Sequence, residues 1–195
     1  MIKWKIKGKK VKLVVGLGNP GKKFELTRHN IGFLVIDYLS DEMKIPLNKK
    51  EFNALVGKRN FKNQMIILAK PDTYMNQSGV AVEGLFKYYR PDLKDIIIIH
   101  DDMDIELGRL KIKVGGGSAG HKGIASIISE LGAPDFTRVK IGIGRPPNGV
   151  DGADFVLSIF SSEEFSLVKE IVPLASKAVL TIINQGIERA MTQFN

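Results

Sequence analysis

The chain has 195 residues, 44% of them hydrophobic and 26% charged, which is typical of one globular domain with a full core. It has no cysteine, which excludes disulfides, thiolate metal sites and a cysteine nucleophile. The formal net charge of +8 favours a polyanionic partner such as nucleic acid or an anionic membrane face, although a basic but inert surface is the alternative. Since the sequence has no apolar signal stretch and no run of about 18 apolar residues, we expect a cytoplasmic protein without a membrane span.

The first dozen residues are rich in lysine, alternating with apolar or small residues. The lysines are Lys3, Lys5, Lys7, Lys9, Lys10 and Lys12. This alternation is compatible with a lysine-protected edge strand or with a mobile arm, and the sequence leaves both open.

Short apolar runs predict strands that are covered on both faces. They are residues 13–15, 65–68, 96–99 and 139–143. Residues 51–61 and 109–114 alternate between apolar and polar side chains, which predicts more exposed, antiparallel strands.

Helical patterns lie between these strands. They cover residues 30–44, 78–90, 121–131 and 162–186. The first two end before a proline and the third ends in glycine, as helices commonly do. Pro173 is predicted to kink or split the last helix.

Alternating strands and helices predict a single α/β domain, a three-layer sandwich whose mixed, largely parallel sheet carries helices on both faces. The segment 146–154 is rich in Pro, Gly and Asp. We expect it to be a long loop that borders a cleft.

A carboxamide and an imidazole follow the first buried strand, where open α/β folds place their ligands. They are Asn19 and His29. The glycines of residues 16–21 also match the dinucleotide fingerprint G-x-G-x-x-G. We reject that interpretation, because no helical pattern opens on the third glycine and Asp37 lies inside a predicted helix.

All three histidines lie beside predicted strand or helix ends. We expect His100 and His121 to be structural and His29 to be functional. Asp101 leaves the strand 96–99 at the same sheet edge as His29, so the two can meet, and a carboxylate on one ring nitrogen favours proton uptake at the other. The alternative is that the aspartates at 101, 102 and 104 only form a turn.

Asn76 follows another apolar strand and precedes a helix, so its simplest role is that of an N-cap. Together with Asn19 it also offers neutral donors and acceptors that suit an ester or amide carbonyl.

The glycine-rich loop 115–120 lies between a strand and a helix, where bare backbone amides can hold an anion or a peptide backbone. It lacks the P-loop lysine but matches G-x-S-x-G around Ser118, the nucleophile motif of serine esterases. The only later histidine is His121, with no carboxylate between. A serine mechanism is therefore the weaker alternative.

Two further alternatives remain open. Asp102 and Asp104, with His100, have the ligand chemistry for Mg²⁺ in a nucleotide or phosphoryl transferase. A non-catalytic RNA-binding domain is the other.

Six motifs in order resemble bacterial peptidyl-tRNA hydrolase. They are GLGNPG (16–21), TRHNIG (27–32), YMNQSG (74–79), HDDMD (100–104), GGGSAGHKG (115–123) and IGIGRP (141–146). The resemblance covers the chain from about Lys12 to the C-terminus. It implies that residues 1–10 are a basic N-terminal extension and that residues 11–195 form the hydrolytic domain.

The resemblance implies a monomeric, cytoplasmic, cofactor-free esterase, without a metal, that releases tRNA from peptides left attached when translation aborts. By matching position, His29 is the general base, Asp101 its orienting carboxylate and Asn19 the residue that helps recognise the acylated amino group. Further matching residues would contact the substrate: Phe24, Tyr74, Met75, Asn76, Gly120 and Lys122 at the groove, and Lys113 and Lys140 at tRNA phosphates.

Three positions depart from the family pattern. Phe24 stands where Tyr is common and loses a hydroxyl but keeps an aromatic face. Lys122 replaces the usual Asn, and an ammonium donates but cannot accept. Lys140 replaces Arg, which keeps the charge without the bidentate geometry. We expect these changes to alter binding and not the reaction.

Overall fold

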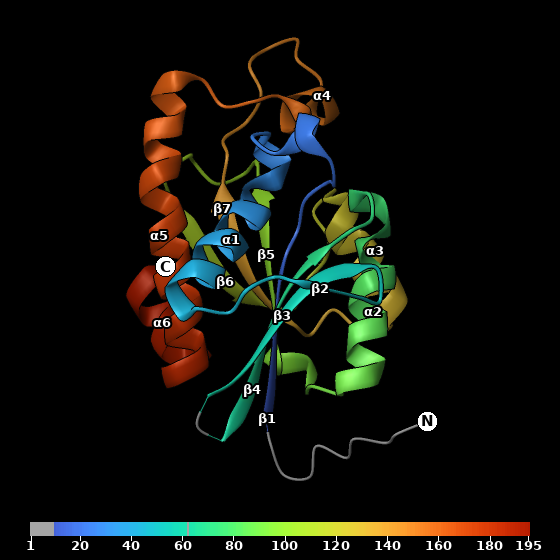
Figure 1. The fold of residues 1–195 in the computed structure, drawn as a ribbon. Coiled ribbons are helices and arrows are strands. Elements are labelled where there is room, and N and C mark those ends of the chain that lie inside the picture. Colours follow the sequence, from blue (N-terminus) through green and yellow to red (C-terminus); the bar gives the residue numbers. More distant parts are fainter. Residues whose placement is uncertain (1–9, 62) are drawn as a thin grey trace.

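The computed structural model describes residues 10–61 and 63–195. Its strands form one mixed sheet in the order β2-β3-β4-β1-β5-β7-β6 (Figure 1). The strands are β1 (Lys10–Gly16), β2 (Lys49–Glu51), β3 (Ala54–Phe61), β4 (Gln64–Pro71), β5 (Ile96–Asp102), β6 (Leu110–Val114) and β7 (Thr137–Gly142). The central strands β4, β1, β5 and β7 are parallel, and antiparallel pairs flank them on both sides.

Helices cover both faces of this sheet (Figure 1). They are α1 (Ile31–Met43), α2 (Ser78–Tyr89), α3 (Lys122–Leu131), α4 (Gly152–Leu157), α5 (Ser162–Gln185) and α6 (Ile187–Phe194), with short 3-10 turns η1 (Lys22–Phe24), η2 (Arg28–Asn30), η3 (Met75–Gln77) and η4 (Leu93–Asp95). Helices α1, α5 and α6 share one apolar core with the sheet, and α2 and α3 share the other. The predicted three-layer architecture is confirmed.

Strand β1 shows how the alternation of side chains builds both cores. Val14 packs with the α1 and α5 side, while Leu13 and Val15 pack with the α2 and α3 side, and all three are fully buried. Because successive side chains of this segment are buried on opposite faces, all of them are apolar, which is why residues 13–15 read as an apolar run.

Two predicted boundaries were wrong, and one of the two alternatives for Pro173 is excluded. Residues 51–61 are not one strand, because Phe52 and Asn53 have left-handed backbones that turn the chain between β2 and β3. The expected loop 146–154 ends early, since Asp151 caps helix α4 by accepting the Ala153 N–H. Helix α5 runs through Pro173 without splitting.

Lys12 occupies the central strand β1, so this part of the lysine-rich segment is neither an edge strand nor an arm. Its buried ammonium pairs with Asp95 at 2.7 Å, and Asp95 also lies 3.5 Å from Lys10. A buried ammonium needs such a partner, because desolvation without one is costly. Lys3, Lys5, Lys7 and Lys9 lie outside the described residues, as does the expected extension except for Lys10.

Among the helices of the described chain, none combines the length and apolar character that a bilayer span requires.

Candidate active site

Two glycines allow residues 16–32 to pack closely against the ends of β1 and β5. A Cβ on Gly16 would lie 2.1 Å from the Gly32 carbonyl oxygen, and one on Gly32 would lie 2.5 Å from the Ile99 carbonyl oxygen. Only glycine permits this approach of the α1 N-terminus to the ends of β1 and β5. The glycines therefore place η2, which carries His29, beside the end of β5.

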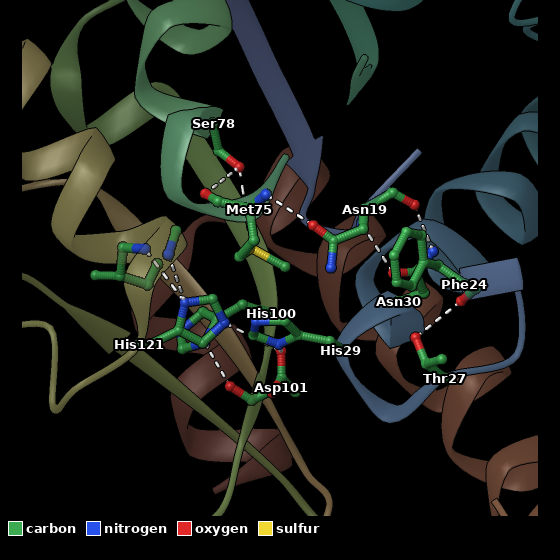
Figure 2. A network of polar contacts seen from close by, with 12 residues as sticks. Asn19, Phe24, Thr27, His29, Asn30, Met75, Ser78, His100, Asp101 and His121 are labelled. Atoms are coloured by element: carbon green, nitrogen blue, oxygen red, sulfur yellow. Dashed lines mark hydrogen bonds and ion pairs between the residues drawn. The ribbon is translucent and has the colours of Figure 1, made fainter. Parts of the chain in front are cut away.

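His29 and Asp101 meet at this edge. Nδ1 of His29 lies 2.8 Å from Oδ1 of Asp101, and both side chains are buried (Figure 2). Because the carboxylate accepts, the Nδ1–H of His29 donates, which leaves Nε2 as the free acceptor nitrogen. An imidazole held in this tautomer is arranged to take a proton.

A second histidine completes the pair. His121 Nε2 lies 3.0 Å from the same Asp101 oxygen, and its Nδ1 accepts the N–H groups of Gly123 and Ile124 at the start of α3. Since Nδ1 must carry a lone pair for those bonds, the proton is on Nε2 and is donated to Asp101. The sequence analysis expected His121 to be structural and missed its contact with Asp101. The position of His121 directly after the glycine-rich loop 115–120 could have indicated that it lies at the site.

Asp101 is an ionised carboxylate in this cluster. Burial by itself raises the pKa of Asp101, but the positive charge that His29 and His121 carry when protonated, together with their hydrogen bonds, outweighs burial and holds the pKa well below its usual range. The carboxylate therefore favours a positive charge on the adjacent rings.

His100 has a different environment. Its Nδ1 donates to the Asp101 carbonyl oxygen at 2.7 Å, and its Nε2 is buried without a partner among the described residues. Burial lowers the pKa of His100 well below the ordinary value, and a positive charge on His121, when that ring is protonated, acts in the same direction. It is therefore a neutral, structural imidazole near the pair.

Asn19 is fixed by three hydrogen bonds (Figure 2). The Asn30 side chain accepts its N–H at 2.8 Å and donates to its carbonyl oxygen at 2.9 Å, while the Asn19 Oδ1 accepts the Met75 N–H at 2.8 Å. Its Nδ2 has no hydrogen-bond partner in the described part of the chain. Asn19 can therefore offer its Nδ2 as a hydrogen-bond donor to a ligand. Asn30, which holds it, was missed at the sequence level.

A cavity of about 1020 Å³ opens over this cluster. Its lining includes the predicted residues Asn19, Phe24, His29, Tyr74, Met75, Asn76, Asp101, Gly120, Lys122 and Lys140. Phe24 and Tyr74 form an edge-to-face pair with ring centroids 6.5 Å apart. The loop after β7 and helix α4 also line the cavity, as expected of the segment 146–154.

Lys113 lies outside that lining, on a basic face of β6 and β7. Lys113 is directly opposite Arg138, and Lys111 is directly opposite Lys140. Lys111 and Lys113 are exposed while Arg138 is buried, so the positive charge that this face offers to a polyanion comes mainly from these two lysines. Lys140 is partly neutralised, since its Nζ lies 2.5 Å from Asp102.

Arg138 stabilises the glycine-rich loop 115–120 through hydrogen bonds to its backbone. Its buried guanidinium donates to the carbonyl oxygen of Gly117 at 2.6 Å and to that of Gly116. Burial lowers the pKa of Arg138. The loop is thereby fixed at the wall of the cavity.

The geometry does not favour the serine alternative. Ser118 lines the cavity, but both ring nitrogens of His121 are engaged, with Asp101 and with the α3 backbone. The nearest histidine in the sequence is therefore not arranged to take the Ser118 proton.

The aspartates of the magnesium alternative are engaged in protein contacts. Asp102 pairs with Lys140 and accepts the Asp104 N–H, and Asp104 pairs with Arg145 at 2.6 Å. A separate set, His29, Asp101 and His121, has ligand atoms within 4.8 Å of one another. A metal on His121 Nε2 would require a proton on Nδ1, which faces two N–H groups. These donors fit a hydrogen-bonded cluster better than a metal site.

Comparison with known proteins agrees with the motifs and the fold. The peptidyl-tRNA hydrolase family model matches residues 13–195. Peptidyl-tRNA hydrolase of Caldanaerobacter subterraneus subsp. tengcongensis is 45% identical over 183 residues, which are 94% of this chain and 98% of that protein. The crystal structure of the Acinetobacter baumannii enzyme has a TM-score of 0.89 at 35% identity and covers 95% of this chain and 94% of that chain. The chain therefore belongs to the peptidyl-tRNA hydrolase family, enzymes that hydrolyse peptidyl-tRNA.

Proposed function

We propose that His29 activates the water that hydrolyses the ester between a peptide carboxyl group and the terminal ribose hydroxyl of tRNA. The observation that carries this proposal is the 2.8 Å contact between His29 Nδ1 and Asp101, which leaves Nε2 as a proton acceptor. Nε2 takes a proton as the water oxygen attacks the ester carbonyl. The ester C–O bond then breaks, and the proton passes from His29 to the leaving ribose oxygen.

Asp101 stabilises the imidazolium that forms during this step. His121 holds the carboxylate through its second hydrogen bond, so Asp101 keeps one orientation while His29 changes charge. All three groups are supplied by this chain, which supports catalysis by a monomer without a cofactor.

Asn19 distinguishes the substrate through its free Nδ2 donor. An amide N–H binds the carbonyl of an acylated amino group but not the ammonium of an aminoacyl-tRNA, which needs an acceptor. Asn76 and the glycine loop are further donors for the carbonyl oxygen where negative charge develops.

The tRNA is proposed to lie toward β6 and β7. Lys113 and Lys140 on these strands, and Lys122 at the start of α3, supply positive charge. Phe24, Tyr74 and Met75 line the cavity that receives the acyl group. Because ribosomes produce peptidyl-tRNA, we place the enzyme in the cytoplasm.

Incubation with N-acetyl-aminoacyl-tRNA, without added metal, tests the proposed chemistry. We expect release of the N-acetyl amino acid, and we expect EDTA to cause no loss of rate. Ser118→Ala should keep at least about half of the wild-type rate, because in this mechanism His29, and neither a metal ion nor Ser118, activates the attacking group. Complete loss in EDTA that Mg²⁺ restores, or complete loss in Ser118→Ala, would overturn the proposal.

A further inference from the structure

A second cavity, of about 360 Å³, adjoins the catalytic cavity, and Asn19 lines both. Its walls come from the loop after β1, from α1, from the start of β3 and from the end of β4. The apolar part of the lining consists of Pro20, Leu26, Phe33, Leu34, Leu55 and Pro71. Phe33 packs under Gly18, where a Cβ would lie 2.7 Å from its ring.

The charged lining is mainly acidic. It contains Glu25, Asp37 and Asp72 but only one cation, Lys70. Lys70 pairs with Asp37 at 2.8 Å and lies over the Phe33 ring at 4.9 Å. Asp72 pairs with the exposed Lys50, while Glu25 has no ion-pair partner among the described residues. Glu25 is therefore the carboxylate of this lining that no described cation neutralises, while Asp37 and Asp72 each share their charge with a lysine.

The strand order separates this cavity from the basic face. Positive side chains gather over β6 and β7 at one side of the sheet, the catalytic pair lies at the ends of β1 and β5, and the second cavity lies at the ends of β3 and β4. An ester bound at His29 has RNA on one side and peptide on the other. With the phosphates drawn to β6 and β7, the peptide extends toward β4 and β3.

We propose that the second cavity is a subsite for the peptide upstream of the esterified residue, with a preference for a lysine or arginine side chain. The aliphatic stem of such a side chain packs on Phe33, Leu34 and Leu55, while its cationic end lies near Glu25 and Asp72. This inference rests on the proposed function, since it takes the ester to be bound at His29.

Peptidyl-tRNAs that differ at one residue test the preference. A set carries Lys, norleucine or Glu at the second, third or fourth residue from the ester, with N-acetyl-aminoacyl-tRNA as the short reference. At one of these positions we expect the KM for the Lys peptide to be about threefold to tenfold lower than for the Glu peptide, with norleucine between. Equal KM values for Lys and Glu at all three positions would overturn the subsite.

The double variant Glu25→Gln, Asp72→Asn assigns the effect to this cavity. We expect it to remove most of the difference between Lys and Glu peptides and to leave the KM of N-acetyl-aminoacyl-tRNA unchanged. The control Asp41→Asn, Glu170→Gln makes the same charge change outside the cavity lining and should preserve the difference. A preference that is equal in both double variants would contradict the assignment. A different result would contradict the proposed function itself: no cleavage of N-acetyl-aminoacyl-tRNA by the wild type, or equal cleavage by the wild type and by His29→Ala.

Discussion

The hydrogen-bonding groups that remain free on His29 and Asn19 determine which ligand atoms the site can bind. Among the described residues, the Nε2 of His29 has no partner because Nδ1 binds Asp101, and the Nδ2 of Asn19 is free to donate while its Oδ1 accepts the Met75 N–H. One is therefore an acceptor and the other a donor. This pairing suits a water that must lose a proton beside a carbonyl that must be held.

Replacing Asn19 with Asp tests the donor role. The carboxylate still accepts the Met75 N–H, so the loop should keep its structure, but the Nδ2 donor is lost. We expect the KM for N-acetyl-aminoacyl-tRNA to rise at least about tenfold, the cost of one hydrogen bond left unmade beside a repelling oxygen.

Steady-state kinetics with Asn60→Asp provides the control, since that exposed position on β3 gives the same charge change away from both cavities. Equal KM values in the two variants would show that Asn19 makes no such contact.

At the scale of elements, η2 is held against α4 and α5 by Arg28, the neighbour of His29. Arg28 donates its backbone N–H to Ser158 and its side chain to Glu164 at 2.8 Å, and its guanidinium lies 4.3 Å from the Phe155 ring centre. The same contacts therefore position His29 and the α4 wall of the cavity.

The variant Glu164→Gln tests this link through pH. The hydrogen bond from Arg28 lowers the pKa of Glu164 below its ordinary 4.5, so the ionised carboxylate stabilises the folded state above that pH and loses the effect as pH falls through the folded pKa. We expect the variant to lose about 0.5 to 1 kcal/mol of unfolding free energy at neutral pH, since the pair is partly exposed.

Urea denaturation at several pH values measures the difference, which should shrink as the solution becomes acidic. Glu163→Gln is the matched control on the same helical turn, because Glu163 accepts from Ser161 but has no cation partner in the described chain. A Glu164→Gln difference that stays constant with pH would count against the ion pair.

Most of the helices and strands could be predicted from the sequence, because the spacing of apolar residues indicates which positions are buried. The apolar runs gave β1, β4, β5 and β7 to within a few residues, and prolines correctly placed the ends of α1 and α2. The turn at Phe52 and Asn53 was missed although Asn53 is a common residue at left-handed positions, because its neighbour Phe52 is an aromatic residue typical of strands. Pro173 was tolerated because packing on the sheet holds α5 around it.

At the scale of the molecule, the meeting of His29 and Asp101 followed from topology. The ends of neighbouring parallel strands share one sheet edge, so residues after β1 and β5 come together even though 72 positions separate them. The contacts of Asn30, the double role of His121 and the Lys140–Asp102 pair depend on side-chain directions that no sequence period encodes. The second cavity also needed coordinates, since its walls come from three separate segments.

The central claim is that His29 and Asp101 together activate water. The most direct measurement is single-turnover cleavage of N-acetyl-aminoacyl-tRNA by excess enzyme, together with the affinity for uncharged tRNA. We predict that His29→Ala lowers the rate by about 100-fold to 10,000-fold and Asp101→Asn by a smaller factor, with tRNA affinity within about twofold of wild type. An unchanged rate in His29→Ala, or a loss of affinity as large as the loss of rate, would contradict the account.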